Sequence, residues 1–113
     1  MIQEKDKKLV YDLIYLDLLI EVLERDLKAI DLSSIKFKSP YKKKIESLIK
    51  EALHDRKEKR QVMRKQGIKI FERKVIDEEF IEWEYVVKGY EAVQRIWTAA
   101  IRKRLQEILT EKL

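Results

Sequence analysis

The stretch LVYDLIYLDLLIEVLERDLKAI, residues 9–30, decides the fold of this chain. Its apolar residues recur at alternating spacings of four and three, the rhythm of a helix with a continuous, coiled-coil-like apolar seam. The residues of this seam are Leu9, Leu13, Leu16, Ile20, Leu23, Leu27 and Ile30. The pattern predicts one long first helix over residues 4–30.

A second apolar row lies on nearly the opposite side of the same helix, because each residue advances about 100° around the axis. Its members are Tyr11, Tyr15, Leu18 and Val22. A surface helix of a small monomer needs only one apolar face, so this helix is either covered from both sides by its own chain or buried partly in a second copy. We expect it to be the central helix, and we take this row as the candidate interface for a homodimer or a partner protein.

The second helix is marked by Ser39 and Pro40, since serine is a favoured N-cap and proline is favoured at the first helical position. We place this helix at residues 40–66 and expect Gly67 to end it in the left-handed conformation. In the connector before it, the alternation of Ile35 and Phe37 with lysines predicts that these two side chains turn inward.

After Gly67 the apolar period changes from that of a helix to that of a strand. One face of the segment would carry Ile81, Trp83, Tyr85 and Val87, and Glu82 and Glu84 would lie on the other. We therefore predict a β-hairpin over residues 68–87 with its turn at Asp77, Glu78 and Glu79.

A competing helical interpretation of the same region remains open. Residues from Phe80 to Ile101 also keep three-four spacing, with Asp77 as an N-cap, and this would make the chain all-helical. Gly89 is unfavourable inside a helix and favours the hairpin. We then expect a third helix over residues 90–112, with Glu91 and Arg95 as an i,i+4 ion pair. The fold class is thus mainly α, or α+β if the hairpin forms, in a single domain spanning residues 1–113.

Composition limits the chemistry and the compartment. The chain has no cysteine and one histidine, His54, so the usual zinc spacings cannot be written, and two glycines do not allow a glycine-rich phosphate loop. The acidic group from Asp77 to Glu84 is typical of solvated turn and surface residues. We expect no catalytic residue, no metal and no cofactor. No apolar stretch approaches the roughly 20 residues of a membrane span, so we expect a cytoplasmic protein.

Charge is distributed unevenly along the chain. Residues 36–74 hold 15 basic and five acidic side chains, whereas both flanking segments are net acidic. A basic face of this kind suits the phosphate backbone of DNA or RNA. The candidate nucleic-acid-binding residues are Lys42, Lys43, Arg56, Lys57, Lys59, Arg60, Arg64, Lys65, Lys69 and Arg73. The alternative is a non-enzymatic protein–protein interaction or structural module that dimerises through the first helix.

The last third of the chain contains Tyr85-Val86-Val87-Lys88-Gly89-Tyr90-Glu91, then Arg95-Ile96-Trp97 and Ala99-Ala100. This part resembles small uncharacterised proteins of low-GC Gram-positive bacteria and their prophages. In those proteins an extended strand leads through a Gly-Tyr pair into an amphipathic helix. The resemblance implies a strand before Gly89 and implies no activity.

Overall fold

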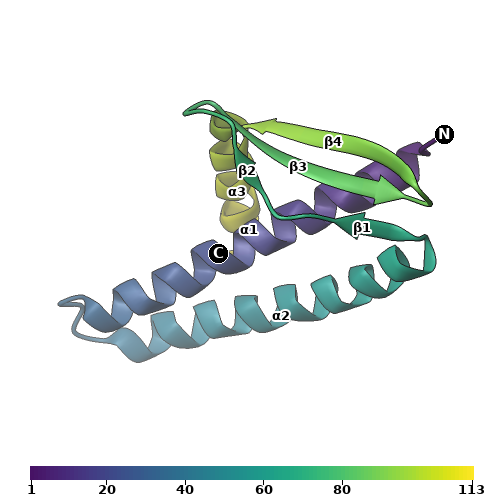
Figure 1. Ribbon diagram of the computed structural model, residues 1–113. Helices are drawn as coiled ribbons and strands as arrows, with labels where there is room; N and C mark the ends of the chain where they lie inside the picture. The colour runs from purple at the N-terminus through teal and green to yellow at the C-terminus, as the bar shows by residue number, and fades with distance from the viewer.

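The computed structural model describes residues 1–113 and combines three helices with one antiparallel sheet (Figure 1). The fold is therefore α+β and mainly helical. The helices are α1 (Glu4–Leu32), α2 (Lys38–Lys65) and α3 (Thr98–Lys112). The strands are β1 (Ile68–Ile70), β2 (Lys74–Val75), β3 (Phe80–Val87) and β4 (Tyr90–Trp97).

Helix α1 is the central element, as its sequence predicts. It runs antiparallel to α2 on one side, and the sheet and α3 pack against its other sides (Figure 1). It supplies nearly half of the buried apolar side chains, from Val10 to Leu23. The predicted long helix is confirmed, and it ends at Leu32, two residues beyond the predicted end.

The chain itself covers the second apolar row of α1. Tyr15 is 5% exposed and lies toward α3, while Leu18 is 7% exposed and lies toward Trp83 of β3. Burial raises the pKa of the Tyr15 hydroxyl well above its usual range. Tyr11 and Val22 remain partly exposed. Tyr15 and Leu18 are thus core residues, which removes the need for a second copy at this face.

The predicted hairpin exists, because β1 and β2 both pair antiparallel with β3. The turn before β3 is built around Asp77, whose carboxylate accepts hydrogen bonds from the backbone N–H groups of Glu79 (2.7 Å) and Phe80 (2.9 Å). The cap signal at Asp77 therefore marks a turn into a strand. The helical alternative for this segment is wrong.

Residues 90–97 form a strand, so the prediction that the third helix begins at residue 90 is wrong. Lys88 (φ 49°) and Gly89 (φ 87°) make a two-residue turn with both φ values positive, a geometry that suits the twist of a hairpin. Strand β4 then pairs along the whole of β3, and α3 begins only at Thr98. Arg95 consequently bonds Glu82 across the strands at 2.9 Å instead of forming a helical pair with Glu91.

The connector between α1 and α2 also differs from the prediction. Ile35 is 42% exposed and Phe37 is 72% exposed, because the connector lies at the far end of the helix pair, away from the sheet and α3 (Figure 1). Helix α2 begins at Lys38, which places Pro40 third in the helix. Proline is tolerated there, since the N–H groups of the first turn have no partner within the helix. Gly67 follows the helix with a φ of 66°, as predicted.

Candidate nucleic-acid interface

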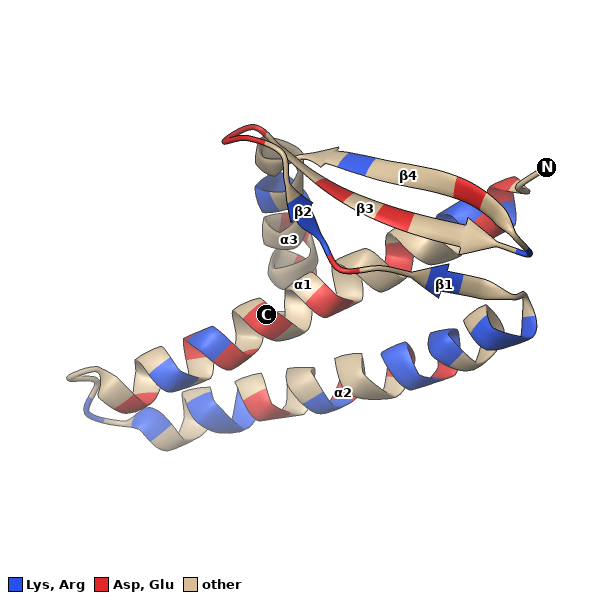
Figure 2. Cartoon of the chain, in the orientation of Figure 1, with Lys and Arg blue, Asp and Glu red and all other residues tan.

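Helix α2 is an outer helix that packs against α1 and β1 and leaves the rest of its surface free. Only Leu48 and Ala52 of its 28 residues are buried. Lys and Arg recur along its whole length, whereas the sheet carries them at scattered positions (Figure 2). The basic middle of the sequence is therefore mainly one exposed helix.

Two of the predicted contact residues turn toward α1. Asp17 of α1 lies 2.9 Å from Arg56 Nη1 and 3.7 Å from Arg60 Nη2, so one carboxylate serves two guanidinium groups. Arg73, which follows β1, pairs with Glu21 of the same helix. These ion pairs hold α2 and the β1–β2 segment against α1. The three arginines therefore have a structural role in the fold.

Two predicted lysines are also paired. Lys42 lies 2.8 Å from Asp31, and its hydrogen bond with that carboxylate raises the lysine pKa above its usual value. Lys59 lies 2.9 Å from Asp55, one turn away on α2. Half of the ten predicted residues are thus neutralised by acidic partners within the chain.

The other five predicted residues, Lys43, Lys57, Arg64, Lys65 and Lys69, are exposed and form no ion pair. Lys43, Lys57 and Arg64 belong to a series with a spacing of seven residues, which Lys50 completes. Lys50 is exposed and unpaired too, although it is not among the ten predicted residues. We call Lys43, Lys50, Lys57 and Arg64 the basic row. The signal for Lys50 was present in the sequence, since two helical turns separate each member from the next.

The basic row is straight and continuous. Seven residues rise about 10.5 Å along an α-helix and rotate its surface by only about 20°, so the four positions span about 31 Å on one side. Three other acidic residues of α2 have partners: Glu51 lies 2.9 Å from Lys112 of α3, Asp55 lies 2.9 Å from Lys59, and Glu58 lies 3.3 Å from His54 on the same helix. Glu46 lies on the outer side with the row, three residues from Lys43 and four from Lys50.

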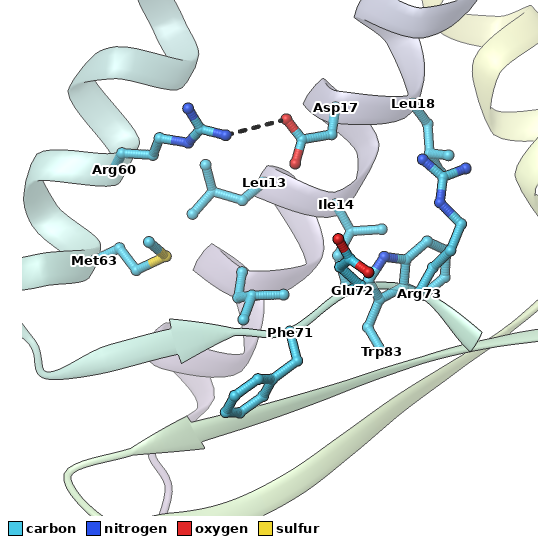
Figure 3. A pocket seen from close by; sticks show the side chains of 11 residues that line it. Leu13, Ile14, Asp17, Leu18, Arg60, Met63, Phe71, Glu72, Arg73 and Trp83 are labelled. Carbon is cyan, nitrogen blue, oxygen red and sulfur yellow. Dashed lines mark ion pairs between the residues drawn. The ribbon is translucent and has the colours of Figure 1, made fainter.

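A groove of about 470 Å³ lies between α1, α2 and the strands, and no member of the basic row lines it (Figure 3). Its apolar lining includes Leu13, Ile14 and Trp83. Asp17 and Arg60 face each other at its edge (Figure 3). Its charged rim holds two arginines and two carboxylates, so it offers no net charge to a ligand.

The remaining residues considered for a catalytic or metal site form ion pairs with neighbouring side chains. Glu82 binds Arg95, and Lys74 binds Glu84 at 2.7 Å, a contact that raises the pKa of the lysine. His54 is 73% exposed beside Glu58. No three His, Asp or Glu side chains lie together as a metal site would require. None of the helices has an apolar stretch of the length and purity needed to cross a membrane.

Comparison with known proteins gives one family. The family model described as YhjD protein matches residues 1–113. A relative, "Uncharacterized protein YhjD" of Bacillus subtilis (strain 168), is 38% identical over 105 residues, which cover 89% of this chain and 87% of that protein. No solved structure matches the chain. The resemblance seen in the last third of the sequence therefore extends over nearly the whole chain.

Proposed function

The chain belongs to the YhjD protein family, and we propose that it binds duplex nucleic acid through the basic row of α2, without reading the base sequence. The observation that carries the proposal is the row itself. Four exposed cations stand in line on the free side of an outer helix, and none of them forms an ion pair within the chain. Four other basic residues of the same helix, Lys42, Arg56, Lys59 and Arg60, are paired with acidic residues of the chain.

The chemistry of the row matches a polyanion. Double-stranded DNA carries one negative charge per about 1.7 Å of axis, so a line of cations about 31 Å long can lie along it and release condensed counterions. Lysine and arginine contacts to phosphate position a protein on the duplex and carry no sequence information. The row contains no Asn or paired Arg of the kind that reads base edges.

Lys65 and Lys69 extend the positive charge from the end of α2 onto β1. Both side chains are exposed, and the Lys69 ammonium lies 5.1 Å from the centre of the Phe71 ring. They lie on either side of Gly67, where α2 turns into β1, and can reach a duplex that extends past the helix end. We therefore place a second contact on β1, the first strand of the hairpin.

Two of the four residues of the alternative interface on α1 are inaccessible to a partner. Tyr15 and Leu18 are buried in the chain's own core, so a partner could reach them only by opening it. A protein partner would have to use another surface.

The proposal is tested by fluorescence anisotropy with a labelled duplex of about 20 base pairs, longer than the basic row, at salt concentrations from about 50 to 200 mM. Contacts by the four cations of the basic row give a slope near −3.6 in a plot of log affinity against log salt, and contacts by Lys65 and Lys69 as well bring it to about −5.4. In the triple variant Lys50→Gln, Lys57→Gln, Arg64→Gln we expect the slope to fall in magnitude by about three, with binding weakened by about tenfold or more.

The matched control is Lys5→Gln, Arg102→Gln, Lys103→Gln. It removes the same three charges by the same chemical changes from exposed, unpaired residues of α1 and α3. We expect this control to keep the wild-type salt slope. No binding by the wild-type protein at the lowest salt, or equal losses in both variants, would contradict a role for the row.

A further inference from the structure

Strand β4 is a free sheet edge. Its eight residues pair with β3 on one side only, and no strand lies on its other side. Because the turn has two residues, the backbone N–H and C=O groups of alternate residues point toward β3, beginning with Tyr90. Those of Glu91, Val93 and Arg95 point away from the sheet, and none of them makes a backbone hydrogen bond outside it.

The sequence of β4 has little that protects this edge. Natural sheets block exposed edges with charged side chains, Pro, bulges or short strands, and β4 has only the oppositely charged Glu91 and Arg95. Strand β4 has no Pro, Lys or Gly, and its eight register pairs with β3 are continuous. The opposite side of the sheet is different, since β1 and β2 have three and two residues. Edge β4 is the long strand that a further strand could join.

The charges on β4 are complementary to those of a second, antiparallel copy of the same strand. Glu91, Val93 and Arg95 lie on one face, with the acidic and basic residues placed symmetrically about the valine. An antiparallel copy with its two-fold axis at Val93 would place each Glu91 directly opposite Arg95 of the other chain. Registers shifted to centre on Glu91 or Arg95 would instead oppose like charges, which is unfavourable.

We propose that two copies of this chain associate through β4, with Val93 opposite Val93, to form one continuous antiparallel sheet. Each copy contributes four strands, so the joined sheet has eight. Backbone hydrogen bonds from Glu91, Val93 and Arg95 supply the pairing, and the two Glu91–Arg95 pairs fix the register.

The exposure of Val93 and Arg95 is consistent with pairing between two copies of β4. Val93 is 52% exposed, and pairing at the two-fold axis would cover it with its own counterpart. The Arg95 guanidinium already donates a hydrogen bond to Glu82 on β3. The Arg95 side chain is nevertheless 57% exposed, and a guanidinium has five N–H donors. It can therefore bridge Glu82 of its own chain and Glu91 of the other. This surface shares no residue with the basic row.

Charge exchange on the full-length chain tests the pairing. Sedimentation velocity and light scattering from about 5 to 500 µM would measure the dimerisation constant. We expect Glu91→Arg alone and Arg95→Glu alone each to weaken dimerisation by about tenfold or more, because each single change opposes two like-charged pairs. All proteins in this comparison carry Glu82→Gln, because a glutamate at position 95 would otherwise face the Glu82 carboxylate on β3. In this background the double exchange should restore dimerisation to within about threefold of the unexchanged chain.

Two further measurements keep the test decisive. Val93→Lys introduces a residue type that blocks natural edges and should give a folded monomer, with folding checked by circular dichroism. A wild-type chain that stays monomeric throughout the concentration range would overturn the proposal. A dimer that tolerates each single exchange would overturn it too, as would a double exchange that fails to restore association, since each result places the contact elsewhere.

Discussion

Replacement of Trp83 by alanine is expected to lower the free energy of unfolding by about 3–5 kcal/mol. Trp83 is 6% exposed and stands on the inner face of β3, in the core cluster that α1 shares with the sheet. Its removal would leave a large cavity that the backbone of β3, held between β4 on one side and β1 and β2 on the other, cannot close. Urea unfolding followed by circular dichroism would measure the loss.

The chain offers a matched control in its second tryptophan. Trp97 is 54% exposed and stacks on Phe80, with ring centres 6.4 Å apart. Trp97→Ala should cost no more than about 1.5 kcal/mol, the range of an aromatic pair at the surface. A loss at Trp83 no larger than about 1.5 kcal/mol would show that the sheet does not pack on α1 through Trp83.

The location of Trp83 was predictable and that of Trp97 was not. From Ile81 to Tyr85 of β3, apolar and acidic residues alternate strictly, because one face packs on the core and the other meets solvent. On β4 the inward positions include Gln94, whereas Val93 and Trp97 point outward. Because of this mixture, the sequence of β4 does not show the two-residue period of a strand. The seven-residue spacing of its aromatic residues, Tyr90 and Trp97, instead fits the helical pattern that continues into α3. An edge strand with apolar residues on its exposed face is read most easily as a helix.

The candidate site was half predictable for a similar reason. Local sequence shows where basic residues concentrate, but their partners lie far along the chain. Arg56 finds Asp17, 39 residues away, and Arg73 finds Glu21, 52 residues away. Only the fold brings these pairs together and thereby separates structural arginines from free ones. The members of the basic row remain unpaired because their seven-residue spacing keeps them on the side of α2 that faces away from α1.

Replacement of Leu23 by alanine is expected to lower the free energy of unfolding by about 2–5 kcal/mol. Leu23 and Val10 are the most completely buried large side chains of the protein. Leu23 belongs to the apolar seam of α1, so its loss removes packing from the element on which both the second helix and the sheet depend. The same urea titration would measure it, with the m-value unchanged if the denatured state is unaffected.

Leu32→Ala provides the control, since it makes the same chemical change at the last residue of the same helix. Leu32 is 89% exposed, and its truncation should alter stability by no more than about 0.5 kcal/mol. The seam residues between them, Leu27 and Ile30, are only half-buried, so the core thins beyond Leu23 toward the connector. A small effect at Leu23 would mean that the core ends earlier along α1, and that the α1–α2 pair is held mainly by its ion pairs.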